Sequence, residues 1–247
     1  MRILIVNPNT TASMTEKAAT AARAVAAAGT EIIAATSRMG PVSIEGHYDG
    51  ALAIPGLLTE LKERQEAGYD AAIVACFDDT GLDAARTFAD VPVLGLCESA
   101  VATAGFLAQR FTVVTTLERS RVLIDNLVRR YGMGGRAKVR ASDIPVLELE
   151  DAGSGAIGKL KAEIERALSE DGAEAIVLGC AGMTDLAREL QELYGVPVID
   201  GVAAAVKQAE ALVSLGLSTS KRGSYASPLP KHFTGAMSGF APIRAVG

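Results

Sequence analysis

Two of the three cysteines in this chain follow apolar segments in matching settings. Cys76 ends the string "AAIVAC" and is followed by "FDDTGLDAAR", whereas Cys180 ends "AIVLGC" and is followed by "AGMTDLAREL". Each stretch then leads to a "VPV" string, so that Pro92 lies 16 residues after Cys76 and Pro197 lies 17 residues after Cys180. This shared order predicts that the two cysteines occupy equivalent places in an internal repeat.

A pair of thiols that face each other across a cleft could transfer protons to and from a carbon atom. A free thiol has a pKa of about 8.5, and a helix N-terminus beside it can lower that pKa by one or more units and give a usable base. One thiolate would remove a proton while the other thiol returns one on the opposite face, which is the requirement for a racemase. The alternative is that Cys76 and Cys180 are small buried hydrophobic residues. Cys97, in "GLCESA", has no counterpart and is expected to be structural.

Small polar residues follow the predicted strands at the points where a ligand would bind. In parallel α/β sheets, ligands bind beyond the carboxyl ends of the strands. Because a helical segment follows each of these exits, free backbone N–H groups and a positive dipole end would face the ligand. The pattern predicts a site for a small ligand rich in carbonyl oxygens, built from "NPNTT" (7–11), "CFDDT" (76–80), "TTLE" (115–118) and "GCAGMT" (179–184).

The elements that must position these residues are short apolar runs alternating with longer helical patterns. Continuous apolar strands between helices indicate parallel sheet covered on both faces, so the fold class is α/β. The strands form two sets of four, which predicts two pseudosymmetric lobes, each a four-stranded parallel sheet flanked by helices, with the active site in the cleft between them. The predicted strands are residues 2–7, 31–36, 71–77, 91–96, 111–116, 145–149, 175–180 and 196–200.

Three further features of the organisation follow from the pattern. The lobe that carries Cys76 is predicted to comprise residues 1–97 and 203–247, and the lobe that carries Cys180 residues 98–202. Ser13 with Glu16 three positions later predicts a capping box for the first helix. From Gly216 on, the chain is rich in Ser, Gly and Pro and is expected to be an irregular arm. Its aromatic residues indicate docking on the body or on a neighbouring subunit: Tyr225, Phe233 and Phe240.

Composition excludes several classes of function. The net charge is −5 and charges of both signs are interspersed, which argues against a nucleic-acid surface. No apolar run reaches the length of a membrane span, and the N-terminal run is too short for a signal sequence. Three widely spaced cysteines form neither a disulfide framework nor a zinc pattern. We expect a cytoplasmic protein with free thiols that binds neither nucleic acid nor membrane.

Two motifs could indicate a nucleotide site or a metal site, but the residues around them argue against both. "GSGAIGK" (153–159) matches nucleotide-binding patterns, but Leu160 stands where a P-loop has Ser or Thr, and the stretch is not in a first strand-to-helix turn. We interpret it as a helix-entry turn. Asp78 and Asp79 could bind a metal, but the chain has only two histidines and neither lies in a ligand-spaced cluster. One of the acids is expected instead to order the Cys76 loop by accepting backbone N–H bonds.

The strings "NPNT", "SIEGHYD", "ACFDDTGLDAAR", "VVTT", "VLGCAGM" and "GVPVIDGV" together resemble the hydantoin racemase branch of the aspartate/glutamate racemase superfamily, to which allantoin racemases are closely related. The resemblance covers nearly the whole chain. It implies two lobes around a cleft, no cofactor and no metal, and two-base proton transfer at C5 of a 5-substituted hydantoin through Cys76 and Cys180. The resulting C5 carbanion is an enolate, which hydrogen-bond donors aimed at the ring carbonyl oxygen would stabilise.

The resemblance also implies which residues contact the substrate. Two of them, Ile44 and Tyr48, fall where a wall beside the substrate's side chain is expected, with ordinary core packing as the alternative. The remaining contacts are implied for Asn9, Thr10, Phe77, Asp78, Thr115, Thr116, Ala181 and Gly182.

Alternative functions remain open at this point. They are allantoin racemase, aspartate or glutamate racemase, a decarboxylase or isomerase on the same fold, and a non-catalytic sensor of small molecules. Decarboxylating relatives need one protonating cysteine, so the presence of two favours racemisation. A sensor would bind its ligand equally well with both cysteines replaced. An alanine-rich surface and the long tail indicate a homo-oligomer.

Overall fold

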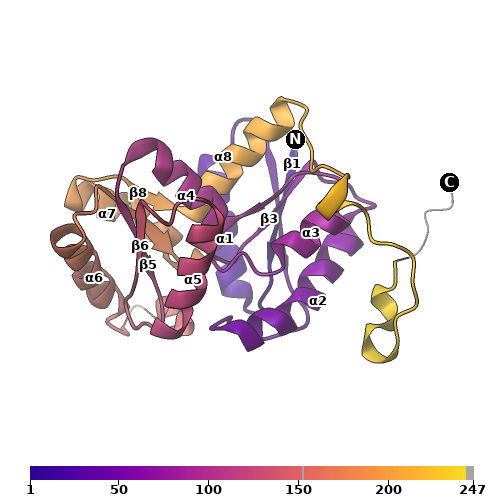
Figure 1. The fold of residues 1–247 in the computed structure, drawn as a ribbon, viewed down its shortest axis with the longest axis horizontal. Coiled ribbons are helices and arrows are strands. Elements are labelled where there is room, and N and C mark those ends of the chain that lie inside the picture. The colour runs from indigo at the N-terminus through magenta and orange to yellow at the C-terminus, as the bar shows by residue number, and fades with distance from the viewer. Residues whose placement is uncertain (152, 243–247) are drawn as a thin grey trace.

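The computed structural model describes residues 1–151 and 153–242 and contains two parallel four-stranded sheets (Figure 1). The strand order is β2-β1-β3-β4 in the first sheet and β6-β5-β7-β8 in the second, so the two lobes repeat one topology. This confirms the predicted α/β class and the two lobes. The strands are β1 (Arg2–Asn7), β2 (Glu31–Thr36), β3 (Ala71–Val74), β4 (Val93–Gly95), β5 (Phe111–Thr115), β6 (Ala137–Ala141), β7 (Ala175–Gly179) and β8 (Val198–Asp200).

Helices cover both faces of each sheet, as the continuous apolar strands require. Every residue of β3, β5 and β7 is buried, so none of these central strands has a face left for solvent. The helices are α1 (Ala12–Val25), α2 (His47–Arg64), α3 (Leu82–Phe88), α4 (Leu96–Leu107), α5 (Glu118–Arg130), α6 (Ala156–Glu170), α7 (Ala187–Tyr194) and α8 (Gly201–Ser214). Short 3-10 helices are η1 (Val146–Glu150), η2 (Ala181–Leu186), η3 (Gly223–Tyr225) and η4 (Gly235–Phe240).

The predicted sixth strand was wrong. Residues 145–149 fall largely in the 3-10 helix η1, and the strand that pairs with β5 is β6, "AKVRA", just before it. The pattern hid this strand because β6 lies at the sheet edge and carries charge: Lys138 and Arg140 both bond to Asp171. An edge strand with charged side chains has no continuous apolar run to recognise.

The predicted capping box was also wrong. Helix α1 begins at Ala12, so that Ser13 lies inside it, and Thr11 is the N-cap residue without a side-chain cap bond. The polar turn before the helix is held instead by Asn9, whose side-chain oxygen accepts the N–H of Thr11 at 2.9 Å. In contrast, "GSGAIGK" is a helix-entry turn as expected, since α6 begins directly after Gly155, which has φ +74°.

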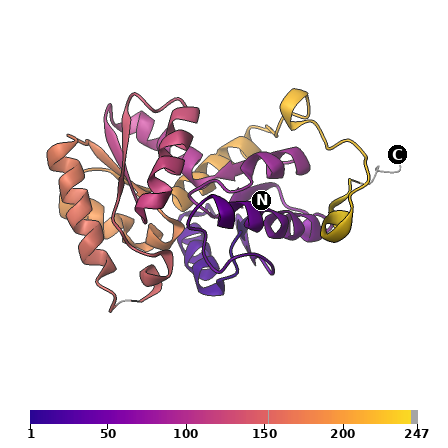
Figure 2. The same cartoon turned by 60° about the horizontal axis from the view of Figure 1, so that its bottom comes forward.

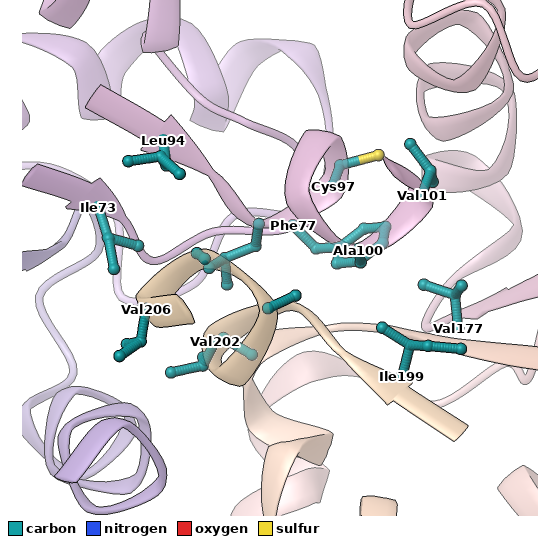
Figure 3. Close-up of a cluster of buried hydrophobic side chains, with 14 of the residues drawn as sticks. Ile73, Phe77, Leu94, Cys97, Ala100, Val101, Val177, Ile199, Val202 and Val206 are labelled. Carbon is teal, nitrogen blue, oxygen red and sulfur yellow. The ribbon is translucent and has the colours of Figure 1, made fainter. Parts of the chain in front are cut away.

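One of the three hydrophobic clusters among the described residues joins the two sheets. Helices α4 and α8 pack against each other, and the cluster in Figure 3 combines their side chains with residues of strands from both sheets, such as Ile73 and Val177. Cys97 is fully buried in this cluster, the environment expected of a structural cysteine. Because α4 starts directly after β4 and α8 directly after β8, the chain passes between the lobes at these helices. The lobe limits given above stay predictions, and residues 243–247 lie outside the described residues.

The tail runs beside α2 and α3, on the side of the first lobe away from the second sheet (Figures 1 and 2). The hydroxyl of Tyr225 donates to Asp83 at 3.0 Å, and its ring lies under the Arg86 guanidinium, 5.8 Å away. Phe233 and Phe240 border a cavity of about 690 Å³ between the tail and these helices. The tail therefore docks on the body of its own chain. Within the described residues, no helix combines the length and apolar character needed to span a membrane.

Candidate active site

Cys76 lies in a tight turn two residues beyond β3. Its N–H donates to the carbonyl of Val74 at 2.9 Å, and its carbonyl accepts the N–H of Asp79 at 3.1 Å. The Thr80 hydroxyl lies 3.4 Å from the Cys76 sulfur and donates to it. The thiol is partly exposed and is held by backbone and side-chain bonds at the carboxyl end of the strand.

Cys180 occupies the corresponding place in the second sheet, directly after β7. It is the N-cap residue of η2, and its sulfur accepts the N–H of Gly182 at 3.4 Å. The strand before it lies close to its neighbour, because a Cβ on Gly179 would stand 2.8 Å from the Cα of Thr115. β3 and β7 hold the same position in their sheets, so the two thiols leave equivalent strands.

The expectation that a helix N-terminus would lower the pKa of the two thiols is wrong, because burial raises both values. The thiols also differ from each other in how readily they ionise. Burial raises the pKa of Cys76 above the range in which thiols normally titrate, Asp78 raises it further, and Cys180 contributes in the same direction. Burial raises the pKa of Cys180 to about 11, while the Gly182 N–H and the Lys17 ammonium oppose that rise. The mutual effect indicates that the thiols lie near each other. The environment of Cys180 therefore favours its thiolate more than the environment of Cys76 does.

We expect this difference to appear in alkylation rates. Since the thiolate is the nucleophile, iodoacetamide at about pH 9 should label Cys180 several-fold faster than Cys76, as measured by mass spectrometry of peptides over time. Lys17→Met should slow the labelling of Cys180 and leave that of Cys76 unchanged, because Lys17 favours only the Cys180 thiolate. Buried Cys97 serves as the internal control and should stay unlabelled. Faster labelling of Cys76 would contradict the assignment.

Asp79 is the acid that orders the Cys76 loop. The backbone N–H groups that it accepts belong to helix α4 and not to the loop itself. Its carboxylate accepts the N–H groups of Cys97 and Glu98 at the start of α4, both at 3.0 Å. Gly95 leaves room for this approach, because a Cβ there would lie 2.3 Å from Asp79 Oδ1. Within the part of the chain that the structure describes, no group of three or more His, Cys, Asp or Glu could hold a metal ion.

Asp78 lies in a different environment. Its Oδ2 atom is buried and has no hydrogen-bond partner, the one such side-chain atom among the described residues. Burial, followed by the nearby Asp79 carboxylate, raises the pKa of Asp78 to about 7. Its charge in turn raises the pKa of both Cys76 and Cys180, which indicates that Asp78 lies near both thiols. This buried oxygen therefore has an unused hydrogen-bond acceptor site near both thiols.

Asp78→Asn should therefore change stability in a pH-dependent way. The folded-state pKa of Asp78, about 7, lies above its ordinary value of 3.8, so its contribution to stability is complete below about pH 4 and is lost as the pH rises toward 7. The melting temperature of the variant relative to wild type should rise by at least about 3 °C between pH 4 and pH 8, or roughly 1 kcal/mol. Calorimetry across this range measures it. Asp143→Asn, at an exposed site, should show no such trend, and a flat difference for Asp78→Asn would contradict the prediction.

Several predicted substrate contacts lie at the strand exits and make local bonds, and all of them except the partly buried Thr10 are buried. The side-chain oxygen of Asn9 accepts the amide of Asn7 at 2.8 Å. Thr10 donates its N–H to the carbonyl of Pro41 at 3.0 Å, and the Thr115 hydroxyl donates to the carbonyl of Gly179 at 3.2 Å. These bonds fix the turns that precede α1 and α5. The other buried residues of this group are Thr116, Ala181 and Gly182.

The remaining predicted contacts fall in three distinct settings. Phe77 is buried in the core shared by the two sheets (Figure 3). Ile44 is buried beside Glu45, whose carboxylate accepts the N–H of Val146 from the second lobe at 2.8 Å. Tyr48 is 78% exposed, at the start of α2. The structure thus brings Ile44 to the border between the lobes and leaves the Tyr48 side chain facing solvent.

The sequence did not indicate that Lys17 contributes to the site. From the middle of α1, its ammonium lies 3.3 Å from the carbonyls of Gly182 and Leu149 and 3.2 Å from a carboxylate oxygen of Glu150. It therefore fixes the Cys180 loop from the other lobe. No local signal could reveal this contact, because its partners are more than 130 positions away in the chain.

The similarities to known proteins agree with this geometry. The family model Asp/Glu/Hydantoin racemase matches residues 3–209. The chain is 50% identical to the hydantoin racemase of Rhizobium meliloti over 236 residues, covering 95% of this chain and 98% of that protein. It is 46% identical to the hydantoin racemase of Pseudomonas sp. (strain NS671) over 241 residues, covering 97% of each.

Solved structures extend the likeness to the fold. The allantoin racemase from Klebsiella pneumoniae superposes with a TM-score of 0.95 at 48% identity, covering 98% of this chain and 100% of that one. The allantoin racemase from Pseudomonas fluorescens gives 0.91 at 44% identity, covering 95% and 100%. A glutamate racemase from Campylobacter jejuni shares the fold alone, with a TM-score of 0.60 at 19% identity over 85% of each chain. The chain therefore belongs to the Asp/Glu/hydantoin racemase family of isomerases.

Proposed function

We propose that this protein racemises 5-substituted hydantoins by two-base proton transfer at C5, with Cys76 and Cys180 as the two bases and without a cofactor. The observation that carries the proposal is the placement of the two thiols after equivalent strands of two repeated sheets, where each sulfur is held by a hydrogen-bond donor. Thiols that leave equivalent strands of two facing lobes are suited to approach one carbon atom from opposite sides.

The order of ionisation gives the direction of the first step. The Cys180 thiolate removes the C5 proton of the enantiomer whose C5–H bond faces it, and the electron pair moves into the ring as an enolate. The Cys76 thiol then gives its proton to the other face of C5. The enzyme ends with a Cys76 thiolate and a Cys180 thiol, which is the state that converts the opposite enantiomer. Backbone N–H groups at the strand exits are the candidate donors to the enolate oxygen.

The charge near the thiols favours a neutral cyclic substrate over a free amino acid. A hydantoin carries ring N–H donors, and the unpartnered oxygen of Asp78 can accept one of them. The carboxylate of a free amino acid would instead be repelled by ionised Asp78. For this reason, aspartate and glutamate are weaker candidates than hydantoins.

Allantoin is the second candidate substrate, because the solved structures at 44% and 48% identity are allantoin racemases. Allantoin is itself a hydantoin with a ureido group on C5, so the same proton transfer applies to it. The curated relatives at 46% and 50% identity are hydantoin racemases, which supports the first candidate.

Polarimetry on a panel of substrates tests the proposal. Single enantiomers of 5-substituted hydantoins, allantoin, aspartate and glutamate are incubated with the protein without added cofactor. We expect optical rotation to decay for hydantoins, and the ratio of rates separates hydantoin from allantoin as the preferred substrate. If rotation decays only for the amino acids, or for no member of the panel, the proposal is wrong.

The setting of the reaction is part of the same proposal. We propose a cytoplasmic enzyme with a small-molecule substrate that works as a homo-oligomer. The exposed apolar side chains of Phe106 and Leu107 at the end of α4, of which Phe106 is 87% exposed, support self-association. Size-exclusion chromatography with light scattering measures the oligomeric state.

A further inference from the structure

The end of helix α5, in the second lobe, makes two contacts with the loop that follows Cys76 in the first lobe. The hydroxyl of Tyr131, the C-cap residue of α5, donates to Asp79 Oδ2 at 2.7 Å. The neighbouring Arg130 pairs with Asp83, at the start of α3, at 2.5 Å. Two adjacent residues of one lobe therefore bind the segment 79–83 of the other.

Asp79 is the point where these connections meet. Its N–H donates to the carbonyl of Cys76, and its carboxylate receives both the first N–H groups of α4 and the Tyr131 hydroxyl. Asp79 also has φ +47°, a conformation that a non-glycine residue adopts at some cost in energy. The surrounding bonds hold it there, so the position of Cys76 depends on the partners of Asp79.

We propose that the hydrogen bond between Tyr131 and Asp79 is a cross-lobe clamp that sets the position of Cys76 relative to Cys180, which makes both Tyr131 and Asp79 positioning residues. This inference rests on the proposed two-thiol reaction. Cys180 is fixed to the second sheet through η2, whereas Cys76 is fixed to the first. The shared core and Lys17 hold the lobes and the Cys180 loop, and the Tyr131–Asp79 bond is the contact between the lobes that acts directly on the Cys76 turn.

The clamp borders a space into which the loop can move. A cavity of about 520 Å³ lies among α2, α3 and α5, and both Asp79 and Tyr131 line it together with Asp78 and Thr80. Loss of the Tyr131 hydroxyl leaves Asp79 Oδ2 with the Glu98 N–H as partner, so the carboxylate is not orphaned. We therefore expect Tyr131→Phe to fold and to release the loop toward this cavity.

The effect on catalysis follows from the geometry of proton transfer. Displacement of a catalytic group by about 1 Å costs roughly 100-fold in rate. Tyr131→Phe should therefore lower kcat for hydantoin racemisation by about 10- to 100-fold. KM should change less than kcat, because the substrate contacts implied for the exits of β1, β5 and β7 lie outside the released loop.

Tyr194→Phe is the matched control. Its hydroxyl donates to Glu165 at 3.2 Å, and both residues belong to the second lobe, so the same chemical change there leaves the lobe contact intact. This variant should keep the wild-type kcat.

A second measurement separates the clamp from the proposed reaction. Dibromobimane joins two thiols only when they lie close together, and the fluorescence of the product reports the Cys76–Cys180 cross-link in the Cys97→Ala background. Wild type and Tyr194→Phe should cross-link at the same rate. Tyr131→Phe should cross-link at least about threefold more slowly, because the displaced Cys76 thiol lies less often within reach of Cys180. This readout does not require racemase activity, so it tests the clamp even if the proposed function fails.

The inference is overturned if folded Tyr131→Phe cross-links Cys76 to Cys180 as fast as wild type. Circular dichroism and the melting temperature show whether the variant is folded. If it is not, Tyr131→4-fluorophenylalanine fills the volume of the hydroxyl without donating a hydrogen bond, and the same two measurements decide. Slower cross-linking in a folded variant supports the clamp, and unchanged cross-linking rejects it.

Discussion

Cys76→Ser and Cys180→Ser are each expected to lower the rate of hydantoin racemisation by about 10²- to 10⁴-fold, the usual contribution of a positioned acid or base. Serine matches the size of cysteine, so the buried turns around both residues stay intact. Its hydroxyl is a far weaker acid than a thiol and supplies almost no anion at neutral pH. Polarimetry with each enantiomer of one hydantoin measures the loss, and Cys97→Ala, a change in the shared core, should retain activity.

Exchange with deuterated water sharpens this test. Each single variant keeps one functional thiol, which reaches only one face of C5. In each variant, one enantiomer should therefore exchange its C5 hydrogen for deuterium faster than it racemises, and the favoured enantiomer should be opposite in the two variants. Proton NMR of the C5–H signal follows the exchange. Undiminished racemisation by both variants would rule out the two-thiol mechanism.

Gly95→Ala is expected to lower the free energy of unfolding by about 3 kcal/mol, or about 10 °C in melting temperature. The new Cβ would lie 2.3 Å from Asp79 Oδ1. The carboxylate cannot withdraw without losing its bonds to the N–H groups of Cys97 and Glu98. Because Asp79 also holds the Cys76 turn, racemase activity should fall together with stability.

Gly158→Ala is the matched control for this prediction. Gly158 lies in helix α6, and a Cβ there would meet nothing within 4 Å. Alanine should therefore stabilise the helix by about 0.5 to 1 kcal/mol. Thermal denaturation of both variants gives the comparison. A wild-type melting temperature for Gly95→Ala would mean that Asp79 is free to move away from Gly95.

Local hydrophobic pattern was sufficient for most of the fold. The runs that form β3 and β7 are continuous and apolar because these strands are covered on both faces. Such a strand can be recognised from its own residues, without knowledge of the rest of the chain. The matching cysteines after them revealed the repeat, which the shared strand order confirms. The hydrophobic pattern did not predict β6, because this strand carries charged side chains. These side chains bond to Asp171, a residue more than 30 positions away in the chain.

The sequence by itself determined where the two thiols lie along the chain, because a strand, its exit and the following helix are set by neighbouring residues. It could not distinguish Asp78 from Asp79. Tertiary structure decided that one carboxylate is left with an unpaired oxygen while the other binds α4 and Tyr131, since that depends on which elements approach the loop from both lobes. The ionisation order of Cys76 and Cys180 was decided in the same way. It follows from the burial of each thiol, from the Gly182 N–H beside Cys180 and from the charges of Asp78 and Lys17, all of which depend on distance in space rather than on separation in sequence.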